Sequence, residues 1–152
     1  MGSAESHAAS TAVLQGAAET VSLAQLGDVA RSLWERLPDG AVLWLSGELG
    51  AGKTSLVRAL CDVAGATPAT SPTFALVHEY ESDGGSIVHV DCYRLRSPEE
   101  AVDLDLDALQ RSARLVAIEW PEKAGAFAPP ATIHLHLEHV DDSDLRRVRR
   151  IV

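Results

Sequence analysis

Lysine, cysteine and long apolar runs are all scarce in this sequence of 152 residues. Lysine occurs only at positions 53 and 123, and the net charge is −9 at pH 7, which argues against a domain that binds nucleic acid by itself through a basic face. No apolar run approaches the roughly 20 residues of a membrane helix. Because Cys61 and Cys92 fall in patterns typical of a helix and a strand, we interpret them as small buried thiols rather than a disulfide or a nucleophile.

The remaining composition is that of one acidic globular domain. Hydrophobic residues make up 46% and charged residues 23% of the chain, and a chain of this length can bury about two thirds of its unfolded surface. Residues 1–18 are mostly Ala, Ser and Gly, and they lack the charged and apolar regions of a signal peptide. We therefore predict a flexible leader over residues 1–18, a folded domain over 19–152, a cytoplasmic location and no contact with a membrane.

Hydrophobic periodicity and turn residues predict alternating helices and strands. We expect helices at about 22–37, 53–64 and 97–113, strands at 41–46 and 114–120, and hairpins at 74–95 and 132–152, the second of them at a sheet edge. Ser22 and Gln25 form a capping box at the start of the first helix. The third helix has Ser97 as its expected cap, followed by Pro98.

A glycine-rich segment, "GELGAGKT", joins the strand at 41–46 to the helix at 53–64. It matches the phosphate-loop (P-loop) pattern G-x-x-x-x-G-K-[ST] in the strand-to-helix context that phosphate binding requires. In such a loop the backbone N–H groups and the helix dipole hold phosphate oxygens, the lysine reaches the β and γ phosphates, and the hydroxyl holds Mg²⁺. The predicted ATP-binding residues are Gly47, Glu48, Leu49, Gly50, Ala51, Gly52, Lys53, Thr54 and Ser55.

The loop and its flanking elements predict the fold class. We expect a single α/β domain similar to the P-loop NTPases, with a mixed sheet flanked by helices and containing antiparallel hairpins.

Two acids end predicted strands, Asp91 in "IVHVDCYRL" and Glu119 in "RLVAIEWPE". Ligands of α/β sheets bind beyond the carboxyl ends of the parallel strands, so both acids are candidates for holding Mg²⁺ or positioning water. The alternatives are a solvated strand end for Glu119 and an acid capping the following turn for Asp91. Trp120 either walls the site or packs in the core.

The segment "TSPTF", residues 70–74, precedes the first hairpin. Its Thr73 either contacts the γ-phosphate or the metal, as residues of switch loops do, or belongs to an ordinary loop.

Five motifs together resemble a known family. The motifs "SGELGAGKTSLVRAL", "SPTFALVHEY", "HVDCYRL", "SPEE" and "IEWPE", in this order and spacing, are similar to those of the TsaE (YjeE) family of small ATPases. The likeness runs from about Thr20 to the last strand. It implies ATP hydrolysis that supports the TsaD and TsaB proteins in forming threonylcarbamoyladenosine beside the anticodon of tRNA. The resemblance implies that this chain acts on tRNA through that complex, and direct contact with tRNA stays open.

The same resemblance implies roles for individual residues. It places Thr54 and Glu119 at the magnesium ion, Asp91 in the catalytic group with Lys53, and Trp120 beside it. It implies that Thr73 is an active-site residue, and it brings Thr20 near the nucleotide. In one departure, Asp105 occupies the position where the family usually has glycine, so Asp105 has to tolerate positive φ if the turn requires it.

The histidines and arginines near the end of the chain each allow two interpretations. His134 and His136 share one strand face, and we interpret that strand as a solvated edge rather than a metal site. The arginines of "RRVRR" are interpreted as protection of a sheet edge against aggregation, with a docking surface for tRNA or the ATP phosphates as the alternative.

We expect a magnesium-dependent ATPase that is slow without partners. The alternatives are a small-molecule P-loop kinase and a non-catalytic nucleotide-binding switch.

Overall fold

The computed structural model describes residues 13–16, 18–69, 76–142 and 144–151. The strands are β1 (Glu19–Ser22), β2 (Ala41–Ser46), β3 (Thr67–Pro68), β4 (Val77–Glu81), β5 (Ile87–Asp91), β6 (Leu115–Glu119), β7 (Ile133–His139) and β8 (Leu145–Arg150). The α-helices are α2 (Leu23–Arg36), α3 (Lys53–Ala64) and α4 (Leu106–Ser112), and the 3-10 helices are η1 (Pro98–Leu104), η2 (Pro121–Lys123) and η3 (Gly125–Phe127).

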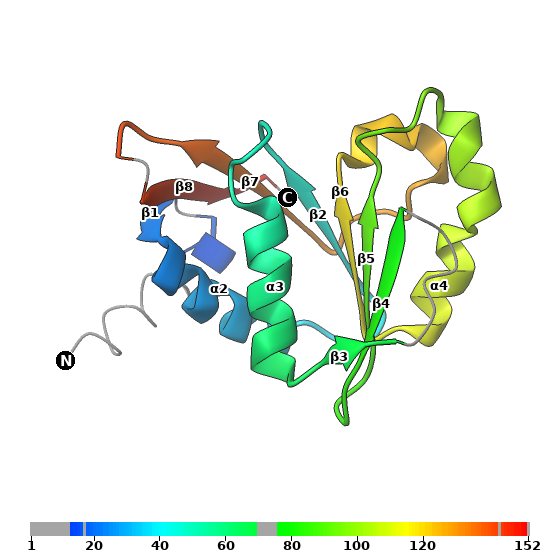
Figure 1. Cartoon of the computed structure of the whole chain (residues 1–152), viewed down its shortest axis with the longest axis horizontal. Coiled ribbons are helices and arrows are strands. Elements are labelled where there is room, and N and C mark those ends of the chain that lie inside the picture. The colour runs from blue at the N-terminus through cyan, green and yellow to red at the C-terminus, as the bar shows by residue number, and fades with distance from the viewer. Residues whose placement is uncertain (1–12, 17, 70–75, 143, 152) are drawn as a thin grey trace.

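All eight strands form one mixed sheet in the order β1-β8-β7-β2-β6-β5-β4-β3. The four central strands β7, β2, β6 and β5 are parallel, whereas β1, β8, β4 and β3 pair in antiparallel fashion. Helices α2 and α3 cover one face of the sheet and α4 lies on the other (Figure 1). This arrangement confirms the predicted α/β fold with its mixed sheet and both hairpins.

Each face of the sheet carries its own hydrophobic core. The α2 and α3 face buries apolar residues of these helices against β2 and β7, including Leu33, Leu56 and Leu135. The other face buries Val90 and Ile118 beneath η1 and α4. Both cores consist of side chains that alternate along the strands, which is the pattern expected when a sheet is packed on two sides.

Capping residues predict correctly where α2 begins and where α3 ends. Ser22 accepts a hydrogen bond from the backbone N–H of Gln25 at 3.1 Å, and Gln25 accepts one from the N–H of Ser22 at 2.8 Å, so the predicted capping box is present. Helix α3 ends at Gly65, whose φ of 67° lies in the left-handed region.

The predicted third helix is broken. Residues 98–104 form η1 and only residues 106–112 form an α-helix, because Asp105 takes a left-handed conformation with φ 46° and ψ 62°. Asp105 therefore adopts the positive φ discussed for this position, and its carboxylate accepts a hydrogen bond from the Ala108 N–H at 3.3 Å. Ser97 is the N-cap residue of η1 and Pro98 follows it, as predicted, but the Ser97 side chain makes no capping hydrogen bond within the described residues.

The second hairpin does not lie at the edge of the sheet. Strand β1 pairs with β8, and Thr20 is opposite Arg147, so the prediction that the arginine-rich strand is an edge was wrong. Strand β7 lies between β2 and β8 and is not an edge either. The sequence did not reveal β1 because a strand of four residues before a helix carries little periodic signal.

The folded part begins before residue 19. Val13 and Leu14 are buried in the core, and the guanidinium of Arg150 donates a hydrogen bond to the Leu14 carbonyl. The predicted flexible leader therefore does not extend to these two residues, while residues 1–12 lie outside the described part of the chain.

The described cysteines are free and buried, as predicted. Burial raises the pKa of the Cys61 thiol to about 11 and that of the Cys92 thiol to about 12. None of the helices in the described ranges combines the length and the apolar character that crossing a bilayer requires.

The geometry at Asp105 predicts the effect of two substitutions. Asp105→Ala should lower the free energy of unfolding by about 1–2 kcal/mol, because alanine both loses the cap and resists positive φ. Asp105→Gly should stay within about 1 kcal/mol of wild type, since glycine accepts this φ without strain. Urea denaturation measures the free energy of unfolding of both variants, with Asp103→Ala in η1 as the control. Equal stability of the alanine and wild-type proteins would contradict the prediction.

Candidate active site

The P-loop connects β2 to α3 and depends on close backbone packing. Gly47 has φ 135°, and a Cβ added there would lie only 2.1 Å from the Leu137 carbonyl oxygen. Gly52, with φ 106°, brings the chain into the first turn of α3. Any side chain at position 47 would therefore push the loop away from β7, and the loop can hold this path only with glycine.

Lys53 folds back over the loop. Its ammonium group donates hydrogen bonds to the carbonyl oxygens of Gly47 and of Glu48, the latter at 2.9 Å. The same group lies 4.6 Å from the centroid of the Trp120 ring. The side chain is only 4% exposed, and this burial lowers the pKa of Lys53. The Lys53 side-chain nitrogen is thus held at the centre of the loop.

Glu119 ends β6 directly beside the P-loop. Strand β6 is parallel to β2, and Glu119 is opposite Leu45 in the register, so its carboxylate reaches the first residues of α3. The Thr54 hydroxyl donates to Oε2 at 3.0 Å and lies 3.3 Å from Oε1. Nε2 of His89 also hydrogen-bonds to Oε2. Glu119 therefore joins the loop to the neighbouring strand β5.

The charge of Glu119 is balanced although the residue is only 3% exposed. Burial acts to raise the pKa of this carboxyl group, but the hydrogen bond and charge of His89, the hydrogen bond from Thr54 and the charge of Lys53 outweigh it. The net result is a lowered pKa. The carboxylate consequently stays ionised at neutral pH within a largely buried site.

Asp91 ends β5 opposite Glu119 in the parallel register. Its carboxylate accepts a hydrogen bond from the Tyr93 N–H at 3.0 Å, so it caps the following turn, as one of its two interpretations required. It also lines a cavity of about 160 Å³ together with Gly52, Lys53, Thr54, Glu119 and Trp120, and with Leu49, Gly50 and Ser55. The structure thus brings both acids and the P-loop into one space.

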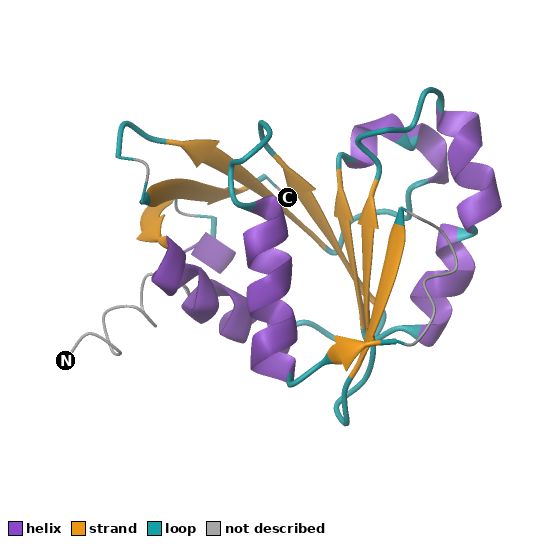
Figure 2. Ribbon diagram, viewed as in Figure 1, coloured by secondary structure: helices purple, strands orange, loops and turns teal. Residues whose placement is uncertain are grey.

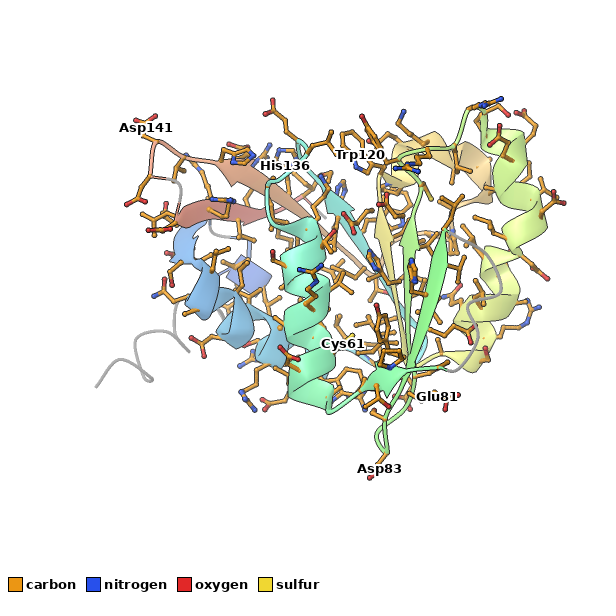
Figure 3. The ribbon with its side chains drawn as sticks, viewed as in Figure 1. Cys61, Glu81, Asp83, Trp120, His136 and Asp141 are labelled. Atoms are coloured by element: carbon orange, nitrogen blue, oxygen red, sulfur yellow. The ribbon has the colours of Figure 1, made fainter. Side chains whose placement is uncertain are left out.

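Trp120 has both of the positions considered for it, against the core and at the wall of the cavity. It packs against the core on the α4 face, and its ring also borders the cavity, 5.2 Å from the centroid of Tyr93. Its backbone is left-handed, with φ 57° and ψ 50°, which is strained for a bulky residue. Figure 3 shows Trp120 at the end of the sheet opposite the hairpin tip at Asp83.

Comparison with known proteins identifies the family. Residues 20–150 match the family described as "Threonylcarbamoyl adenosine biosynthesis protein TsaE". The chain belongs to the TsaE family. The resemblance inferred from the five motifs is thereby confirmed.

Three relatives named "tRNA threonylcarbamoyladenosine biosynthesis protein TsaE" illustrate the similarity. The Rickettsia felis protein is 37% identical over 135 residues, covering 86% of this chain and 74% of that protein. The Streptomyces coelicolor protein is 46% identical over 99 residues (62% and 66%), and the Haemophilus influenzae protein 37% over 103 residues (67% and 65%). The chain spans just under two thirds of the length of the latter two relatives.

A solved structure has the same fold as this TsaE-family chain. The crystal structure of Bacillus subtilis YdiB superposes with a TM-score of 0.68 and 23% identity, covering 88% of this chain and 84% of that one.

Thr20 is a predicted site residue that does not line this cavity. It lies in β1, which is separated from β2 by β8 and β7. Thr73 lies outside the described residues. His134 and His136 point to the same side of β7, and each ring hydrogen-bonds to the Ser46 hydroxyl at 2.8 Å.

His89 is the site residue that sequence reasoning missed. It is only 7% exposed and contacts Glu119 directly. A signal was present in the sequence, because residues two apart on a strand share a face, and His89 precedes Asp91 by two positions. The signal is weak, because an alternating histidine in a strand is equally typical of a core.

The packing of Gly47 predicts a large effect from one methyl group. Gly47→Ala should destabilise the protein by about 2–4 kcal/mol, because the new Cβ would clash with a backbone oxygen that cannot shift without distorting the backbone. Thermal and urea unfolding measure the change. The control is Gly27→Ala in α2, where no atom lies within 4 Å of the added Cβ; it should be neutral or stabilising by up to about 1 kcal/mol. Similar effects of the two substitutions would contradict the prediction.

The His89 contact predicts a difference between two replacements. His89→Phe should cost about 1–3 kcal/mol of stability, because the buried Glu119 carboxylate loses a hydrogen-bond partner. His89→Gln should cost less, since its amide can still donate to the carboxylate. Urea denaturation in the presence of EDTA measures both, and His78→Phe on β4, where the side chain is exposed, is the control. A phenylalanine variant as stable as the glutamine variant would refute the proposed contact.

Proposed function

We propose that this chain is a magnesium-dependent ATPase of tRNA threonylcarbamoyladenosine biosynthesis that acts in the cytoplasm with the TsaD and TsaB proteins. The observation that carries the proposal is the hydrogen bond from the Thr54 hydroxyl to the Glu119 carboxylate, which brings the loop hydroxyl and a strand-end acid together. Membership of the TsaE family and the names of the relatives support the pathway. Contact with tRNA is proposed to occur through the complex.

The hydroxyl and carboxylate oxygens around the cavity suit a nucleotide with its magnesium ion. Hydroxyl and carboxylate oxygens are the ligands that Mg²⁺ prefers, and Thr54, Glu119 and Asp91 offer them in one cavity. Glu119 is buried and charged, which is the state that a cation ligand requires. A bound magnesium ion would neutralise charge on the phosphates and polarise the γ-phosphoryl group.

The chain's own residues would position ATP and exclude water. The loop amides and Lys53 bind the phosphates, and for this Lys53 exchanges its bonds to the loop carbonyls for bonds to phosphate oxygens. Asp91 orients the attacking water and accepts its proton, because its carboxylate borders the same cavity. Trp120 closes one side of the cavity against solvent. Thr73 is proposed to contact the γ-phosphate or the metal, as the family resemblance implies.

Hydrolysis by the isolated chain should be slow. The described residues that line the cavity include no arginine to stabilise the charge that develops on the γ-phosphate. A partner that supplies such a group or orders the site would raise the rate, which agrees with the proposed action in a complex with TsaD and TsaB.

The decisive experiment measures ATP hydrolysis with and without TsaD and TsaB. Partners should stimulate the wild-type rate, and Glu119→Gln should lower the stimulated kcat by roughly 100-fold or more, because a neutral amide holds the cation poorly. ATP binding without magnesium should change little. Glu122→Gln, an exposed acid three residues later, is the control.

The same experiment separates the alternatives. Release of inorganic phosphate is expected, whereas transfer of phosphate to an added metabolite would indicate a P-loop kinase. A nucleotide switch would keep its support of threonylcarbamoyladenosine formation in the Glu119→Gln variant. Equal hydrolysis rates with and without TsaD and TsaB would refute the proposed partnership.

A further inference from the structure

A second cavity adjoins the active site. It has a volume of about 410 Å³ and lies between α3 and the β4–β5 hairpin. Thr54 and Asp91 line both this cavity and the smaller one around the P-loop. In Figure 2, strands β4 and β5 lie to the right of α3. We call this second cavity the basic groove, because Arg58 and Arg94 line it.

The groove is positively charged although the chain is acidic. Arg58 of α3 and Arg94, which follows β5, line it together with His78 and His89, and Asp91 is the one acid among the described residues of the lining. Arg58 and Arg94 are exposed, and neither forms an ion pair with any of the described residues. On a chain with a net charge of −9, this is a local field that favours an anionic occupant.

The exposure of the lining favours a macromolecule over a small metabolite. Pockets for small ligands usually enclose 70–90% of the ligand surface, whereas Arg58, His78 and Arg94 face solvent. Tyr93 is also 40% exposed at the rim. Carboxylates carried on a protein segment need no enclosure, because the rest of the interface holds them in place.

We propose that the basic groove receives an acidic segment of the partner complex, whose carboxylates pair with Arg58 and Arg94 beside Asp91. This inference rests on the proposed function, since it takes the TsaD–TsaB complex as the partner. Because Thr54 and Asp91 belong to both cavities, a segment seated here would contact the residues that surround the nucleotide. The groove would therefore join partner docking to the ATP site.

The test is binding of the purified full chain to the TsaD–TsaB complex with a non-hydrolysable ATP analogue, measured by calorimetry at 50 and 200 mM salt. The double variant Arg58→Glu/Arg94→Glu should raise Kd at least tenfold, because like charges would face each other, and it should weaken the salt dependence. Arg58→Lys/Arg94→Lys should bind within about threefold of wild type, since it keeps both charges. Thermal unfolding checks that each variant is folded.

The matched control is Arg31→Glu/Arg111→Glu, which makes the same change in net charge on α2 and α4, away from the groove. It should bind like wild type. Equal binding by the groove variant and this control overturns the inference and leaves the proposed function intact. Dimerisation of the chain through the groove, or saturable binding of citrate there with no effect on the partner, overturns it as well. Failure of the wild type to bind TsaD–TsaB overturns the proposed partnership, and this inference with it.

Discussion

The contact between Thr54 and Glu119 depends on the parallel pairing of β2 with β6. Both strands end at the same side of the sheet, so the loop after β2 and the acid at the end of β6 meet without any further adjustment. A shift of one residue in this register would turn Glu119 to the opposite face, where the α4 core lies. The position of the whole site thus follows from strand register.

The active site holds three ionisable side chains in a buried environment, where an unpaired charge is unfavourable. Lys53, His89 and Glu119 are all buried, and each would be costly alone. Polar neighbours satisfy them, since Glu119 accepts hydrogen bonds from Thr54 and His89 while Lys53 donates to the loop carbonyls. Removing His89 takes one hydrogen bond from the buried Glu119 carboxylate and leaves it the bond from Thr54, so stability falls although the acid keeps a partner.

Local patterns predicted those elements whose signals lie within a few residues. The capping box at Ser22, the ends of α3 and both hairpins were correct because turn and cap chemistry acts locally. The break at Asp105 was visible only as a departure from the family pattern, since aspartate is compatible with a helix N-terminus as well as with a left-handed turn. Strand β1 was missed because its pairing partner lies more than 120 residues away in sequence.

The sequence by itself determined the P-loop, the strand-end acids and the family, because these depend on residue types at fixed short spacings. Only the tertiary structure decided that His89 supports Glu119, that Trp120 is both core and cavity wall, and that Arg58 and Arg94 face one groove. These relations join residues from different strands and helices. Their distances depend on sheet order and helix packing, which short-range patterns do not specify.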